Sequence, residues 1–240
     1  MSAVFPQKRG NVKAYRLVEV LVWAVVAYLL ATNSEALIVF ALGFLYGSIT
    51  AAPASVLQNL IYVSPVFPLI LGLFAVVRLK LAGANIWAST GLFARTRPGD
   101  TLLGAFAGVA CVGVAATSLQ IAARYFDVPP MHAMPPQVHL YFMTIGAVVP
   151  GVCEELYFRG MMMRVANGLA AAVLVPLTSA AFSIWHVGTP AYLPHTFLLG
   201  LILGMLTLGT GRLAPAIVAH TIANAGTGLL FLYGYNPADW

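Results

Sequence analysis

The sequence predicts an all-α fold, a polytopic transmembrane bundle of about eight helices of which seven or eight would cross the membrane. Hydrophobic residues make up 60% of the 240 residues. Charged residues make up 8%, against roughly a quarter in an ordinary soluble domain. Apolar runs of near-membrane length recur along the whole chain, and a helix needs about 20 such residues to cross the hydrocarbon core. These runs do not alternate between apolar and polar residues, which argues against an outer-membrane barrel.

The first four predicted helices lie at residues 17–32, 36–52, 57–79 and 101–123, separated by TNSE, AAPAS and RTRPGD. Basic residues before the first run resemble a signal peptide, but we expect a retained first span because more spans follow. The second run is short and contains two glycines. If it crossed fully, the basic loop between the third and fourth helices would lie outside, against the positive-inside tendency. We therefore expect the second run to be re-entrant or interfacial.

The last four predicted helices lie at residues 138–167, 170–188, 194–210 and 213–234. The proline-rich stretch DVPPMHAMPP precedes the first of them, and VGTPAYLP and GTGR separate the later ones. His132 lies within the proline-rich stretch and His139 follows it, so we expect both at the membrane surface. His195 begins a helix, where an interfacial role is favoured over one lining a site. The methionines after Arg159 are expected to fill the core.

The whole chain, 1–240, is predicted to form one integral membrane domain. Within it, residues 1–80 hold helices whose topology the sequence leaves open, and residues 90–234 form a core that carries the polar residues. The compact loops are typical of a prokaryotic cytoplasmic (inner) membrane protein. The net charge of +5 comes mainly from short basic clusters. Such clusters usually mark cytoplasmic helix ends and lipid headgroups, so we expect membrane lipid as a partner and no nucleic acid.

Few ionisable residues lie inside the predicted spans, and one group of them comes from three helices late in the chain. With one polar companion they are Glu154, Glu155, Arg159, His186, His220 and Asn224. A charge at the centre of a membrane helix costs roughly 3 kcal/mol, so such residues usually mark functional sites. Glu155 and Arg159 are four residues apart and can pair on one helical face, whereas Glu154 points about 100° away.

Each polar element also has a plainer interpretation. Glu155 and Arg159 could form an ion pair that only satisfies itself, and His186 alone could be a packing residue. His220 and Asn224, again four residues apart, could join two helices by hydrogen bonds. The two cysteines have no CxxC partner and are expected to be small core residues. The three elements together indicate a site more strongly than any one of them alone.

The chemistry of these residues suits amide hydrolysis by water. A carboxylate can take a proton from water, and an asparagine amide with an imidazole N–H can donate hydrogen bonds to a developing oxyanion. No serine or cysteine stands beside a histidine as a nucleophile, so direct attack by water is favoured. No cofactor is required by the sequence. A divalent metal such as zinc, held by Glu154, His186 and His220, stays an alternative, although the HExxH pattern is absent.

The motifs that carry these residues resemble those of the CPBP family, which includes the CAAX prenyl proteases of the Ras-converting type and Abi-like bacterial proteins. EELYFR fits EExxxR, FSIWH fits FxxxH and HTIAN fits HxxxN, in the order found in that family. The resemblance covers about residues 90 to 230. It implies an intramembrane endopeptidase of the glutamate-dependent kind, a kind formerly grouped with metalloproteases.

The resemblance also implies a role for each motif residue. Glu154 and His186 would activate water, and His220 and Asn224 would stabilise the oxyanion. A supporting set would hold the local structure: Glu155, Arg159 and Phe182. The substrate would be a membrane-associated protein or peptide, processed at a CAAX-type C-terminus or another sorting signal.

Other functions stay open at the level of sequence. One is bacteriocin self-immunity or membrane regulation without proteolysis. Another is a transporter that uses the same polar residues, although transporters usually contain internal repeats and none is evident here. The oligomeric state and the side to which the site opens do not follow from the sequence.

Overall fold

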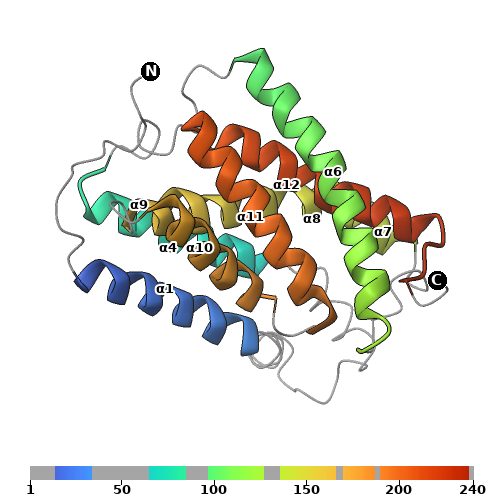
Figure 1. The fold of residues 1–240 in the computed structure, drawn as a ribbon, viewed down its shortest axis with the longest axis horizontal. Helices are drawn as coiled ribbons and strands as arrows, with labels where there is room; N and C mark the ends of the chain where they lie inside the picture. The colour runs from blue at the N-terminus through green and yellow to red at the C-terminus, as the bar shows by residue number, and fades with distance from the viewer. Residues whose placement is uncertain are drawn as a thin grey trace, which may run out of the picture.

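The computed structural model describes residues 14–33, 65–84, 97–126, 136–165, 170–186 and 190–237. Within these ranges the protein is all-helical and forms a helical membrane bundle, as expected (Figure 1). Its longer helices are α1 (Ala14–Thr32), α4 (Val66–Leu81), α6 (Pro98–Ala122), α7 (Pro136–Met143), α8 (Ile145–Glu155), α10 (Ala171–Ile184), α11 (Leu193–Thr210) and α12 (Ala214–Leu232). Three short elements join them: the π-helix η3 (Leu156–Met162), α9 (Met163–Val165) and the 3-10 helix η4 (Pro190–Tyr192).

Among the residues that the structure describes, three segments are long and apolar enough to cross a membrane: Pro98–Ala122, Pro190–Thr210 and Ala214–Leu232. Two shorter apolar segments, Leu17–Leu30 and Ala171–Ile184, lie in α1 and α10. The predicted helix at 36–52 lies outside the described residues, so its re-entrant or interfacial placement stays a prediction.

Close packing of α6 on α12 depends on two glycines four residues apart. A Cβ atom on Gly104 would lie 2.6 Å from the carbonyl oxygen of Pro215, and one on Gly108 would lie 2.8 Å from that of Ala219. Both distances are shorter than any side chain tolerates, so only glycine allows this approach. Arg212, just before α12, also forms an ion pair with Asp100 in the first turn of α6. The start of α6 and the start of α12 are therefore fixed at the same end of the bundle.

The helix predicted at 138–167 is interrupted, which corrects the expectation of one continuous element. Thr144 has φ −121° and ψ −99° and separates α7 from α8, while its hydroxyl donates to the Leu140 carbonyl at 2.7 Å. After Glu155 the chain winds as the π-helix η3 before the short α9. π-helical turns are rare and often mark functional sites, because the added residue rotates the side chains that follow.

The core lies around α8 and η3, which pack against α4, α10 and α12. Figure 1 shows α1 and α6 at opposite sides of the molecule, with α10 and α11 between them. The three methionines after Arg159 are fully buried in this core, as predicted (Met161, Met162 and Met163). Cys111 and Cys153 are both free.

His139 keeps its expected place at the membrane surface as a prediction, since burial within the bundle does not test depth in the membrane. Its side chain is buried, with 2% of its area exposed, and its Nδ1 atom has no hydrogen-bond partner in the described structure. The reason is that α7 packs against both α8 and α12, so its inward face is covered. His132 lies outside the described residues.

Candidate active site

Glu155 is the centre of a buried hydrogen-bonded chain. Arg159 Nη1 donates to Glu155 Oε1 at 2.7 Å, which confirms the predicted pairing across one helical turn. The same oxygen lies 2.9 Å from His220 Nδ1 on α12. Arg159 Nη2 donates to the carbonyl oxygen of Gly200 on α11 at 3.1 Å. The fully buried Glu155 carboxylate thus connects the end of α8 to α12, and the fully buried Arg159 guanidinium connects η3 to α11.

Glu154 is held differently from its neighbour. Its Oε1 atom accepts a hydrogen bond from Trp185 Nε1 at 3.0 Å. Its Oε2 atom is buried and has no hydrogen-bond partner in the described structure, and it lies 3.9 Å from His220 Nε2. That distance is too long for a hydrogen bond and leaves both atoms able to contact a third group.

His186 follows Trp185 at the end of α10 and is partly buried. Its Nδ1 atom lies 2.9 Å from the Phe182 carbonyl oxygen, which can only accept a hydrogen bond. Nδ1 therefore carries a proton, and the Nε2 atom of the neutral ring is left with a lone pair. An imidazole in this tautomer can accept a hydrogen bond or a proton at Nε2.

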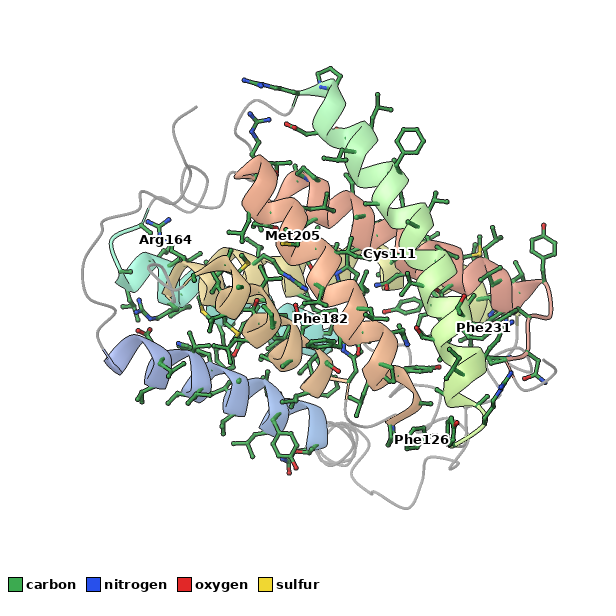
Figure 2. The ribbon with its side chains drawn as sticks, in the orientation of Figure 1. Cys111, Phe126, Arg164, Phe182, Met205 and Phe231 are labelled. Atoms are coloured by element: carbon green, nitrogen blue, oxygen red, sulfur yellow. The ribbon has the colours of Figure 1, made fainter. Side chains whose placement is uncertain are left out.

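Phe182 packs between the polar residues. Its ring meets the rings of His186 and His220 edge to face at 4.9 and 5.5 Å, and the Arg159 guanidinium carbon lies 4.6 Å from its centroid. Figure 2 shows the labelled Phe182 side chain in the middle of the bundle. The Phe182 ring therefore contacts both histidines and the arginine, as expected of a residue that supports the site by packing.

Two glycines let the helices come close enough to bring these side chains together. A Cβ on Gly151 would lie 2.5 Å from Thr221 Oγ1, so α8 touches α12 one turn before the glutamates and beside His220. A Cβ on Gly200 would lie 2.8 Å from the Ser179 Cβ, so α11 touches α10 where the Gly200 carbonyl accepts from Arg159. The two glycines thus set how closely the helices approach, and this spacing brings the charged groups within hydrogen-bond distance of their partners.

The observed contacts bring together most, but not all, of the residues of the three motifs. Glu154, Glu155, Arg159 and His220 are joined directly, and His186 reaches them through Phe182. Asn224 is partly buried one turn after His220 on α12. None of the contacts described above involves the Asn224 amide, so its oxyanion role stays a prediction.

The structure describes no preformed cluster of metal ligands at the site. Across the described ranges, no group of three or more His, Cys, Asp or Glu side chains is placed so that it could hold one. Of the three residues considered for zinc, His186 places Nδ1 on a backbone carbonyl and Glu154 accepts an indole N–H at Oε1, so each contact engages only one of the residue's two donor atoms. A histidine that binds a metal usually donates its other ring N–H in this way. The zinc alternative therefore stays a prediction.

Trp185 and Gly200 belong to the site but were not predicted as part of it. The signal for Trp185 was its place in an apolar stretch, because a buried indole N–H usually needs a hydrogen-bond acceptor. Gly200 carried no such signal, since its contribution is a backbone carbonyl that any residue could supply.

Comparison with family models gives one match. Residues 136–226 match the Rce1-like family, described as type II CAAX prenyl endopeptidase Rce1-like. The matched segment runs from α7 into α12 and contains all three motifs. The comparison with curated proteins found no match, and neither did the comparison with solved structures. Over residues 136–226, which are less than half of the chain, the match agrees with the resemblance of the three motifs to the CAAX prenyl protease family.

Proposed function

We propose that this protein is an intramembrane endopeptidase that hydrolyses a peptide bond with water activated by Glu154 and His186. The observation that carries the proposal is the buried Glu154 Oε2 atom, which has no hydrogen-bond partner in the described structure and lies 3.9 Å from His220 Nε2. An unpartnered buried carboxylate oxygen is costly, and a substrate or water that binds there relieves the cost. Glu155 Oε2 also has no hydrogen-bond partner in the described structure, but the Glu155 carboxylate is held at Oε1 by both Arg159 and His220. Glu154, by contrast, has no charged partner within hydrogen-bond distance among the described residues.

The reaction proceeds in two steps on this proposal. Glu154 Oε2 takes a proton from a water molecule that His186 Nε2 orients, and the water oxygen attacks the carbonyl carbon of the substrate. A tetrahedral intermediate with a negative oxygen forms. The C–N bond then breaks, and Glu154 gives its proton to the leaving nitrogen. The products are a carboxylic acid and an amine, the acid proton then passes to the amine to give a carboxylate and an ammonium group, and Glu154 returns to its starting carboxylate.

His220 and Asn224 would donate hydrogen bonds to the oxyanion. Because His220 already points Nδ1 at the Glu155 carboxylate, it can donate from Nε2 only when the ring carries a second proton. The Glu155 carboxylate stabilises that charged ring, as the buried carboxylate of a serine protease triad stabilises its imidazolium. Glu155 thus supports the site by holding His220, and Arg159 supports it by holding Glu155.

The proposed substrate is a membrane-borne peptide whose C-terminal region carries a prenylated cysteine. Its support is the family match, whose description names CAAX prenyl endopeptidases. Substrate and lipid would be the partners, with no nucleic acid and no metal needed for the chemistry. A prokaryotic cytoplasmic membrane is the proposed location, which the compact loops support.

The test is cleavage of a farnesylated, internally quenched peptide that ends in CAAX, by the purified full-length chain in detergent micelles. Glu154→Gln keeps the volume and removes the base, so cleavage should fall to background. His186→Ala should do the same, and both variants should keep the thermal unfolding temperature of the wild type.

Full activity in the Glu154→Gln variant would exclude the proposed base. If the wild type does not cleave the peptide, mapping of protein termini in membranes with wild type or Glu154→Gln identifies another substrate. Identical termini in the two samples would contradict proteolysis and favour the immunity or transport alternatives.

A further inference from the structure

We infer that Trp185 is a positioning residue for this reaction, because its indole N–H holds Oε1 of Glu154 and leaves Oε2 as the oxygen that takes the proton. The inference rests on the function proposed above and adds the residue that orients its base. The motif resemblance assigned no role to this position, which is one of the unspecified residues in FxxxH.

The contact is specific and buried. Trp185 Nε1 lies 3.0 Å from Glu154 Oε1, and the exposed fractions of the two residues are 9% and 3%. An indole has one N–H donor and no acceptor, so it can only donate to the carboxylate. Hydrogen bonds with an ionised partner are shorter and about twice as strong as neutral ones, and exclusion of water strengthens them further. The bond therefore fixes the carboxylate plane and distinguishes its two oxygens.

The last turn of α10 holds the indole in place. The Trp185 backbone N–H donates to the Ala181 carbonyl at 3.1 Å, and the His186 N–H donates to the Ser183 carbonyl at 2.8 Å. The second of these spans three residues and tightens the helix end. Trp185 and His186 therefore lie on the same rigid turn. The Trp185 side chain donates to Glu154, and Nδ1 of His186 donates to the Phe182 carbonyl oxygen.

This arrangement couples the two residues proposed to activate water. Glu154 comes from α8 and His186 from α10, and no hydrogen bond between them is seen in the described structure. The hydrogen bond donated by the Trp185 indole N–H connects Glu154 directly to the helix end that carries His186. Without it, the carboxylate could rotate about its last bond and point Oε1 or Oε2 away from the water.

A packing role is the competing explanation, since Trp185 also belongs to the hydrophobic core. Trp185→Phe separates the two, because it keeps an aromatic ring and removes the N–H donor. The chain offers a matched control in Trp23. Its ring packs against Phe74 and Tyr157 at 6.3 and 6.2 Å, and Trp23→Phe makes the same chemical change away from the glutamates.

In the farnesylated-peptide assay, Trp185→Phe should lower kcat about ten- to a hundredfold, the factor expected for losing a hydrogen bond to a charged group. KM should stay within about twofold, because the bond orients the base and does not bind the substrate. Trp23→Phe should leave both constants unchanged. A wild-type kcat for Trp185→Phe would overturn the inference, as would an equal loss in Trp23→Phe.

A spectroscopic measurement tests the bond without turnover and with the indole intact. In ¹⁵N-labelled protein in micelles, the Trp185 indole N–H resonance should shift when Glu154→Ala removes the acceptor, while the Trp23 resonance stays in place. An unmoved Trp185 resonance would overturn the inference even if Trp185→Phe failed to fold.

The two measurements also separate this inference from the proposed function. If Glu154→Gln is inactive and Trp185→Phe is fully active, only the positioning role fails. If Glu154→Gln cleaves as the wild type does, the proposed base fails, and the resonance shift still reports whether the hydrogen bond exists.

Discussion

Two glutamate–arginine pairs with N···O distances of 2.5 to 2.7 Å lie in different parts of the bundle. Arg78 Nε donates to Glu19 Oε1 at 2.7 Å between α4 and α1, where the side chains are 29% and 24% exposed. Arg159 Nη1 donates to Glu155 Oε1 at 2.7 Å, and both side chains are fully buried. Geometry alone would rate the two pairs as equal.

Their surroundings show why they are not equal. An exposed pair exchanges one hydrated state for another and contributes about 0–1 kcal/mol. A buried pair must first lose its hydration, and its attraction only roughly offsets that loss, so removing one partner leaves a costly unpaired charge. Glu155 Oε2 and Arg159 Nε have no hydrogen-bond partner in the described structure, so even this pair is incompletely satisfied. The buried cluster is thus better explained by a function than by stability.

The largest expected effect is that of Arg159→Ala. It would leave Glu155 buried without its cation and remove the bond to the Gly200 carbonyl, so unfolding free energy should fall by about 3–5 kcal/mol. Denaturant unfolding in detergent micelles measures the loss, with Arg78→Ala as the matched control at the exposed pair. A loss of similar size in both variants would show that burial does not distinguish the pairs.

A second prediction tests whether the close approach of α8 and α12 maintains the buried cluster. Gly151→Ala places a methyl group 2.5 Å from Thr221 Oγ1, and the resulting overpacking should cost about 1–3 kcal/mol. It should also lower peptide cleavage, because His220 lies next to Thr221 in sequence.

Gly113→Ala is the control for that variant. Gly113 lies in α6 with open space around its Cβ position, so alanine should stabilise the helix by about 0.5–1 kcal/mol. Gly151→Ala as stable and active as Gly113→Ala would mean that the helices can separate without harm to the site.

The smallest expected effect is that of Glu19→Gln. Because this pair is partly exposed, unfolding free energy should change by less than about 1 kcal/mol, and cleavage should be unaffected. The difference from wild type should shrink further in high salt, which screens exposed charges. A change as large as that of Arg159→Ala would contradict the comparison.

The buried pair could be predicted from sequence and the exposed pair could not. Glu155 and Arg159 are four residues apart in one helical segment, so periodicity alone places them on a common face. Glu19 and Arg78 are 59 residues apart, and their contact depends on how α1 packs against α4. Local spacing carries information about contacts within a helix and very little about contacts between helices.

The fold, too, was predictable where local sequence determines it and unpredictable where it depends on packing between helices. Apolar length and turn residues predicted α6, α11 and α12 to within a few residues. The break at Thr144 and the π-helix after Glu155 were not foreseen, because a continuous apolar stretch has the same composition in α-helical and π-helical form. The hydrogen bond from Trp185 was missed since it depends on the helix end of α10 meeting α8.

The placement of Glu155 and Arg159 on one segment also bears on how the chain enters the bilayer during synthesis. Residues 155 and 159 are made before residues 200 and 220, so the other partners of this cluster do not yet exist when the segment emerges. A lone arginine would oppose insertion by roughly 3 kcal/mol. Because Glu155 lies one turn from Arg159 on the same segment, the two side chains can neutralise each other as the segment enters the bilayer. Their contacts with Gly200 and His220 can form later, once α11 and α12 have been made.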